Sequence, residues 1–261
     1  MKTKNFLMTT LFLLASIFAG FGQSRSDSDL TKKAEEAAAL NEQGIIYVKS
    51  GDYRKAVEKF HAAVVLKPDY SVALNNLGVA LTKQGRYDAA IEFLQKATAL
   101  IPRYTEAHFN LGCAYNMVGQ YAKAAQSFER AISLEPNFAR AYNNLGVAYA
   151  AMGKQKEAVA NYSQAIKLEP NDSRFYNNLG TSLFETGKSR DSIALFEQAL
   201  KLDPDFKQAH FNLGVVYLSL NNKKSAIEQY KILKTLAPQS AEELYAGIYR
   251  AQILFVKQMS R

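Results

Sequence analysis

The chain has very few of the residues from which most catalytic and metal sites are built. Its 261 residues include 1 cysteine, 3 histidines and no tryptophan. The single cysteine, Cys113, excludes an internal disulfide and any metal site made from a cysteine pair. A glycine-rich phosphate loop and the His-Glu-x-x-His motif of zinc proteases are also missing from the sequence. We therefore expect no catalytic residues, no bound metal and no cofactor, and we expect that the protein is not an enzyme.

Proline is scarce as well, but its positions are strictly periodic. All 6 prolines recur at intervals of 34 residues, and a series of glycines recurs with the same interval. A constant period of this length is the signature of a stacked-repeat architecture. The prolines are Pro68, Pro102, Pro136, Pro170, Pro204 and Pro238, and the glycines are Gly44, Gly78, Gly112, Gly146, Gly180 and Gly214.

Each repeat has the pattern of two helices, as the fourth copy shows. Apolar residues spaced by three and four predict helices over about 139–152 and 156–168. Gly153 is expected to end the first helix in a left-handed conformation, and the Glu169-Pro170 pair ends the second. Gly146 is expected where the two helices approach closely. One such pair cannot bury its apolar stripe alone, so stacked pairs are required.

The repeat resembles the tetratricopeptide repeat over residues 37–240. Its third copy carries the family pattern as Leu111-Gly112, Tyr115, Ala124, Phe128, Ala131 and Pro136. Departures are mild: Gln43, Ser192 and Leu233 replace one leucine and two alanines of the pattern. The resemblance implies an all-α fold, a right-handed superhelical solenoid of antiparallel helix pairs. The first helix of each pair would line its concave wall.

The remaining segments suggest how the chain is organised around the repeats. Lys2 and Lys4 precede an apolar run from Phe6 to Phe21, which is typical of a secretory signal peptide. We expect export to the periplasm or the outside of the cell, with an uncleaved membrane anchor as the alternative. The expected segments are a signal peptide (1–22), a linker with a helical extension (23–36), six repeats (37–70, 71–104, 105–138, 139–172, 173–206 and 207–240) and a capping helix (241–261).

The candidate binding residues form a series two positions before the repeat glycines. Asparagine is a poor residue for a helix interior, yet it occupies this position in five consecutive repeats. A side-chain amide can donate and accept, so a row of them could hold the backbone of an extended peptide. The alternative is that each asparagine bonds the neighbouring helix, and both can hold. The residues are Asn76, Asn110, Asn144, Asn178 and Asn212.

Neighbouring positions would tune the specificity of this peptide site. Arg140 and Arg174 lie one repeat apart, and Asn143 and Asn177 follow each of them by about one helical turn. Arginine pairs well with carboxylates, so we expect a ligand segment with at least one acidic group near repeats four and five. The family's clamp for chaperone C-terminal carboxylates is not present in its usual form.

Two functions are compatible with these features. The first is an exported, non-enzymatic scaffold that binds a peptide or protein partner in the concave groove. The alternative is a structural assembly module of an envelope complex, acting through its convex face and C-terminal helix, which also has surplus apolar residues for self-association. The net charge of +8 is scattered, and nucleic-acid binding is not expected without a basic stripe. After signal cleavage no integral membrane span is expected.

Overall fold

The computed structural model describes residues 29–259, with side chains described as far as residue 248. The expected signal peptide and most of the expected linker lie outside the described residues. The chain divides after Ala114 into two compact units, and each unit is described by itself. Between residues 29 and 259 all regular structure is α-helical, and none of the helices in this range is long and apolar enough to span a membrane.

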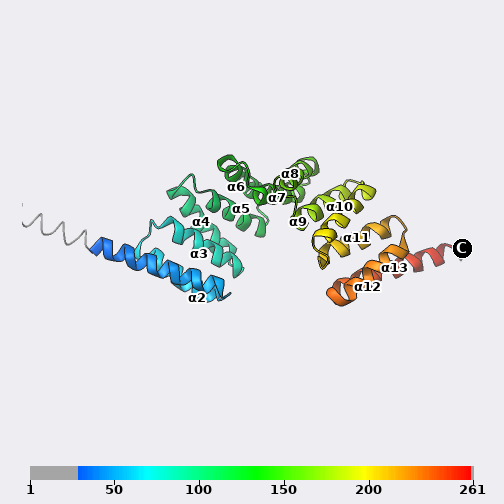
Figure 1. Cartoon of the computed structure of the whole chain (residues 1–261), viewed down its shortest axis with the longest axis horizontal. Helices are drawn as coiled ribbons and strands as arrows, with labels where there is room; N and C mark the ends of the chain where they lie inside the picture. Colours follow the sequence, from blue (N-terminus) through cyan, green and yellow to red (C-terminus); the bar gives the residue numbers. More distant parts are fainter. Residues whose placement is uncertain (1–28, 260–261) are drawn as a thin grey trace, which may run out of the picture. The chain divides into compact units, whose positions relative to one another are not determined.

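The first unit is a stack of consecutive helices joined by short turns (Figure 1). Each helix lies beside the next one in the sequence, as in α2 with α3 and α3 with α4. The helices are a first helix over residues 29–49, α2 (Tyr53–Leu66), α3 (Ser71–Lys83), α4 (Tyr87–Leu100) and α5 (Thr105–Met117), whose last turn belongs to the second unit.

The second unit continues the same pattern. Its α7 and α8 agree within one residue with the helices expected for the fourth repeat. Consecutive helices pack on each other throughout, so the expected all-α solenoid of helix pairs is confirmed. The helices are α6 (Tyr121–Leu134), α7 (Ala139–Ala151), α8 (Gln155–Leu168), α9 (Ser173–Glu185), α10 (Ser189–Leu202), α11 (Lys207–Ser219), α12 (Lys223–Leu236) and α13 (Pro238–Met259).

The repeat glycine lets the two helices of a pair approach closely. A Cβ atom added to Gly146 of α7 would lie 2.6 Å from the ring of Tyr162 in α8. At the same position of the second repeat, a Cβ on Gly78 would lie 2.4 Å from Leu94. Both distances are far below van der Waals contact, so any larger residue would force the helices apart.

The turn inside each pair depends on a second set of glycines. Gly153, between α7 and α8, has φ +74°, the left-handed conformation expected from the sequence. In the last repeat the equivalent residue is Asn221, with φ 57°. Asparagine is the non-glycine residue that tolerates this conformation best, so the turn survives without glycine.

The fifth repeat carries an aromatic residue at a different position from the other repeats. The residue before the first helix of a repeat is aromatic in the second and third copies, where Tyr70 and Tyr104 pack against small buried residues. The fifth copy has Asp172 there, and Phe175, which is 1% exposed, stands where the other copies have alanine. Phe175 packs against Ala139 and Ala165, so the pocket is filled from a different position on the helix.

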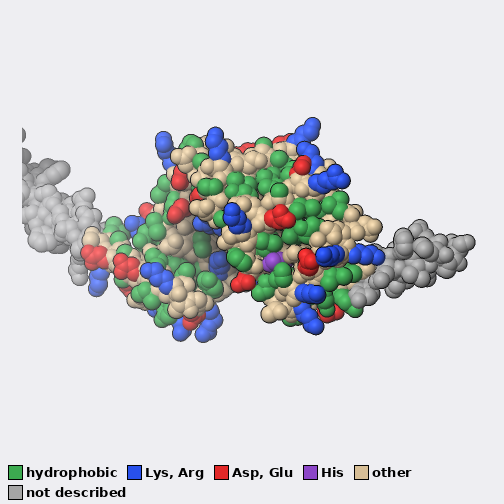
Figure 2. Space-filling view, turned by 45° about the vertical axis from the view of Figure 1, so that its right-hand side comes forward, with side chains coloured by type: hydrophobic (Ala, Val, Ile, Leu, Met, Phe, Trp, Pro, Cys, Tyr) green, Lys and Arg blue, Asp and Glu red, His purple; other side chains and the backbone are tan. Residues whose placement is uncertain are grey.

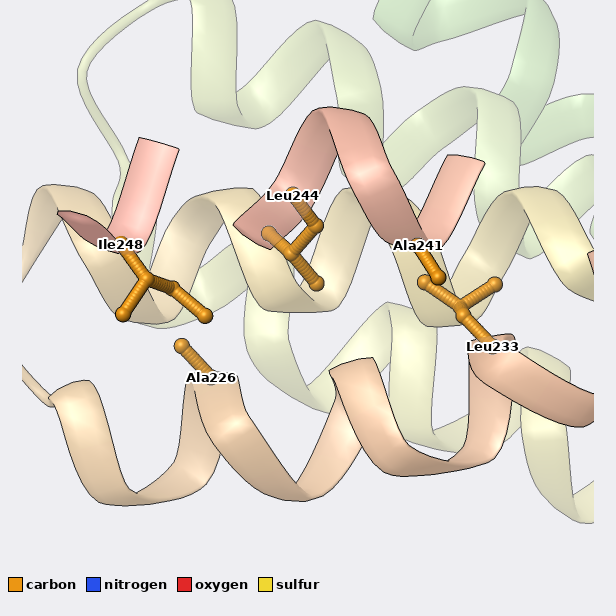
Figure 3. Close-up of a cluster of buried hydrophobic side chains, with 5 residues drawn as sticks. All are labelled: Ala226, Leu233, Ala241, Leu244 and Ile248. Atoms are coloured by element: carbon orange, nitrogen blue, oxygen red, sulfur yellow. The ribbon is translucent and has the colours of Figure 1, made fainter. Parts of the chain in front are cut away.

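The C-terminal helix covers the last repeat. Leu244 and Ile248 of α13 point towards Ala226 and Leu233 of α12, and all four side chains are buried (Figure 3). α13 also packs against α11. It begins at Pro238, three residues before the expected start, because proline is well tolerated in the first turn of a helix. The apolar residues expected on its far side lie beyond the described side chains.

Candidate functional site

The candidate site is the surface formed by the first helix of each pair, here called the first-helix face. In the first unit it comprises the helix over residues 29–49, α3 and the first part of α5. In the second unit it comprises α7, α9, α11 and α13, of which each contacts the next. Within each unit this face carries two asparagine positions: a partly exposed rim asparagine and, one residue earlier, a buried recessed asparagine.

In the first unit, rim asparagines bond recessed asparagines of the preceding repeat. The Nδ2 of Asn76 in α3 donates to the Oδ1 of Asn41, at 2.9 Å. The Nδ2 of Asn110 in α5 donates in the same way to the Oδ1 of Asn75, also at 2.9 Å. Asn41 and Asn75 are both 4% exposed. Each bond joins side chains 35 residues apart, so it ties one repeat to the next.

The second unit has the same arrangement. The Nδ2 of Asn178 donates to the Oδ1 of Asn143, and that of Asn212 donates to the Oδ1 of Asn177, both at 2.9 Å. The recessed amides also donate to the rim residues beside them, Asn143 to Asn144 at 3.3 Å and Asn177 to Asn178 at 3.4 Å. These bonded pairs form an asparagine ladder in each unit.

Both ladders stop where the recessed position holds phenylalanine. In the first unit Phe109 occupies the recessed position, immediately before Asn110. In the second unit Phe211 occupies it, immediately before Asn212. A phenylalanine side chain has no acceptor for a rim amide. Of the recessed residues, only Asn143 and Asn177 are predicted from the sequence, as residues that tune the specificity of the peptide site; the sequence analysis does not predict that Asn41 and Asn75 belong to the same network. The signal was present, because asparagine recurs at that position too.

The ladder leaves hydrogen-bonding capacity at the surface. An amide nitrogen carries two hydrogens, and among the described residues Asn178 uses its nitrogen for one bond. Asn110 follows Phe109, which carries no amide, whereas the Oδ1 of Asn76 accepts from the Asn75 before it. Because the ladder fixes the orientation of each rim amide, this remaining capacity is preorganised rather than free to rotate.

The two arginines differ in how they are held. The guanidinium of Arg174 bonds the carboxylate of Asp172 through Nε, at 2.8 Å to Oδ1, and through Nη2 to Oδ2. The hydrogen bonds from Arg174 hold the pKa of Asp172 below its usual value, and the positive charge of Arg140 adds to this effect. Asp172 also caps α9 by accepting from the backbone N–H of Arg174. Arg140, at the start of α7, is exposed.

Other titratable groups in the described structure have structural roles. The ring of His210 is 6% exposed and lies between the side chain of Gln229, at 2.7 Å, and the carbonyl of Pro204, at 2.8 Å. The hydroxyl of Tyr149 donates a hydrogen bond to the carboxylate of Glu129. This bond raises the pKa of Tyr149 to about 12. Among residues 29–248 no group of three or more histidine, cysteine, aspartate or glutamate side chains could hold a metal ion.

The basic excess of the chain is not gathered on the face that Figure 2 presents. On the face that Figure 2 presents, basic and acidic side chains are interspersed with apolar and polar ones. Salt bridges are few and local: within the described chain they include Lys55 with Asp52 and Lys96 with Glu92, each within one turn of helix. Such exposed pairs contribute little to stability.

Solved structures with the same fold are numerous. MamA is 28% identical, with a TM-score of 0.57 over 62% of this chain and 94% of that one. PilF from Pseudomonas aeruginosa is 19% identical, with a TM-score of 0.70 over 82% of this chain and 99% of that one. YrrB, described as a tetratricopeptide-repeat protein with an unusual peptide-binding site, is 22% identical, with a TM-score of 0.56 over 73% and 99%. No curated protein matches the chain significantly.

The family assignment comes from the sequence match. The family model for the C-terminal domain of cilia and flagella-associated protein 70, a tetratricopeptide-repeat domain, matches residues 13–246. Together with the helix pairs and the repeat neighbours, this match bears out the resemblance noted from the sequence. The fold of this family commonly mediates interactions between proteins. The chain belongs to the tetratricopeptide-repeat family of the cilia and flagella-associated protein 70 C-terminal domain.

Proposed function

We propose that this protein is an exported, non-enzymatic scaffold that holds an extended segment of a partner protein on its first-helix face. The observation that carries the proposal is the row of rim asparagines, each partly exposed. Four of them are oriented by a bond to the preceding repeat. Amides that are already oriented can bond a peptide backbone without first losing side-chain freedom. Backbone bonding of this kind tolerates many ligand sequences, as a scaffold requires.

The recessed residues and the arginines have supporting roles in this proposal. Asn143 and Asn177 are 8% and 6% exposed, so they act by holding the rim amides in place. An acidic group of the ligand would lie near Arg140 and Arg174, at the starts of α7 and α9, where Arg140 is exposed. A peptide-binding neighbour of the same fold, YrrB, is consistent with this use of the family's architecture. The signal-like sequence of residues 1–22 supports the export part of the proposal.

The test is capture of partners from an envelope extract by immobilised protein. The Asn144→Ala/Asn178→Ala variant and the Arg140→Glu variant should lose partners that the parent retains. Asn161→Ala/Asn171→Ala is a matched control, since Asn161 bonds only within α8 and Asn171 lies in an exposed turn. Thermal unfolding separates lost capture from lost folding. Identical capture by all four proteins would refute the proposal.

A second candidate function is assembly of an envelope complex through the last two helices, α12 and α13. Its supporting observation is the exposure of large apolar side chains there: Ile227 and Ile232 of α12 are 38% and 40% exposed, and Tyr245 of α13 is 37% exposed. Under this function, Ile227→Glu/Ile232→Glu should release the chain from a complex in size-exclusion chromatography. The asparagine variants would then have no effect on capture.

A further inference from the structure

We propose that the first unit contains the pocket in which the bound segment is anchored, and that this pocket takes a bulky apolar side chain flanked by acidic residues. This inference rests on the proposed function and specifies the ligand. The pocket is a hollow of about 260 Å³ on the first-helix face. Its residues are Ile45, Val48 and Lys49 of the first helix, Phe60 of α2, and Asn76 and Val79 of α3.

The walls of the pocket are mainly hydrocarbon. Ile45, 36% exposed, and Val79 line it from two neighbouring first helices, and Phe60, 1% exposed, contributes a buried ring. Ile46, the next residue along the helix, is 63% exposed. An apolar hollow of this size is suited to one leucine, isoleucine or phenylalanine side chain, whose burial would remove these surfaces from water.

The polar groups at the pocket determine what should stand next to the anchor. Asn76 lies at the wall, where its Nδ2 is held by Asn41 at 2.9 Å, and so it can bond the ligand backbone beside the anchor. Lys49 lines the pocket, and Lys83 lies one helical turn beyond Val79 on α3. Neither lysine forms an ion pair with any residue from 29 to 248. Two uncompensated cations beside an apolar hollow favour a ligand with acidic residues at that end.

The spacing of these groups limits where the acidic residues can be. Val79 and Lys83 are four residues apart on a helix, which corresponds to about 6 Å along its axis. An extended peptide advances about 3.3 Å per residue, so the acidic residue should lie about two positions from the anchor. The acidic side chain Glu42, one turn before Ile45, marks the opposite end and disfavours an acid there.

Equivalent positions elsewhere in the chain do not reproduce this combination. Val147 of α7 corresponds to Val79, but the residue one turn onward is Ala151 instead of lysine. In α9 the same two positions hold Thr181 and Glu185, and Glu185 accepts from Gln155 at 2.7 Å. The combination of this pocket with Lys49 in its lining and Lys83 one turn beyond Val79 therefore belongs to the first unit, and Val147 provides a matched control.

The test is the binding of a fluorescein-labelled Gly-Ser peptide that carries one phenylalanine with glutamates about two residues away, followed by fluorescence anisotropy with the full chain. Val79→Glu places a carboxylate in the pocket. It should weaken binding by at least about tenfold, which corresponds to about 1.4 kcal/mol of binding free energy. Lys49→Ala/Lys83→Ala leaves the apolar core intact and should weaken binding several-fold at low salt. Val147→Glu should leave binding unchanged.

The probe peptides distinguish the two parts of the inference. Replacing phenylalanine by alanine should reduce the difference between the parent and Val79→Glu to the repulsion between the new carboxylate and the glutamates of the peptide, and replacing the glutamates by lysines should reverse the effect of the lysine variant. Failure of the parent to bind the peptide, or binding that depends on Val147 and not on Val79, would overturn the inference. Binding that depends on Val147 and not on Val79 would leave the scaffold proposal intact. The scaffold proposal is refuted by a different result, normal capture of partners by the asparagine variants.

Discussion

The amide nitrogen of Asn178 donates a 2.9 Å hydrogen bond to the Oδ1 of Asn143, which joins α9 to α7 across 35 residues of sequence. Asn143 is 8% exposed, so its amide has left water almost completely. The bond therefore satisfies a buried polar group and sets the orientation of a surface one. Stability and binding are therefore coupled at this residue pair, and a variant of either asparagine can change both the free energy of unfolding and the capture of partners.

Loss of the recessed asparagine should destabilise the second unit. Asn143→Ala removes the acceptor of the partly exposed Asn178 amide, which water can then reach, so the free energy of unfolding should fall by about 0.5–1.5 kcal/mol. Urea denaturation followed by circular dichroism measures the change. Asn171→Ala, in an exposed turn, is the control and should be neutral. Equal stability of the two variants would show that the ladder adds nothing to folding.

In the fifth repeat, an aromatic residue at position 172 should restore the stability that is lost when Phe175 is replaced by alanine. Phe175→Ala empties the space beside Ala139 and Ala165 and should cost about 3–5 kcal/mol, as for other buried phenylalanines. Adding Asp172→Tyr restores the arrangement of the second repeat, where Tyr70 fills the equivalent space. The double variant should therefore be more stable than Phe175→Ala alone in urea denaturation. A further loss of stability would mean that the two positions do not share one space.

Gly146 should not tolerate even a methyl group. In an ordinary helix, replacing glycine by alanine stabilises by about 1 kcal/mol. Here the new Cβ would lie 2.6 Å from the ring of Tyr162, so Gly146→Ala should instead lower the melting temperature. In a Tyr162→Ala background the obstruction is gone, and the same substitution should become neutral or stabilising. A double-mutant cycle by thermal unfolding checks this.

The charge of Asp172 should make a pH-dependent contribution to stability. Its pKa in the folded chain is lowered by hydrogen bonds from Arg174, so the ionised form stabilises the folded state above the pKa of the unfolded chain. This contribution is lost as the pH falls below about 4 and through the lowered pKa of the folded chain.

The variant Asp172→Asn keeps an acceptor for the helix cap but removes the charge. It should be less stable than the parent near neutral pH by at most about 1 kcal/mol, because Arg174 is largely exposed. The two proteins should converge in urea denaturation as the pH falls towards 3. Asp69→Asn, in the turn before α3, is the control. A difference that persisted in acid would assign the effect to packing instead of charge.

The sequence alone determined the repeat, its helix pairs and the family. Gly153 and Gly146 could be assigned their roles because a left-handed turn and a close approach are local requirements, and glycine meets them whatever surrounds it. The position of the rim asparagines could also be predicted, since stacked repeats place equivalent residues of successive first helices on the same face.

Only the tertiary structure decided what those asparagines bond and how the fifth repeat is filled. The partner of Asn178 is Asn143, on the preceding repeat, and the offset between stacked helices depends on all the side chains packed between them. For the same reason the sequence could not show that Phe175 replaces the aromatic missing at Asp172, or that Ile45 and Val79 border one hollow with Lys49. Local propensity acts within one helix, whereas these contacts exist only after the repeats have stacked.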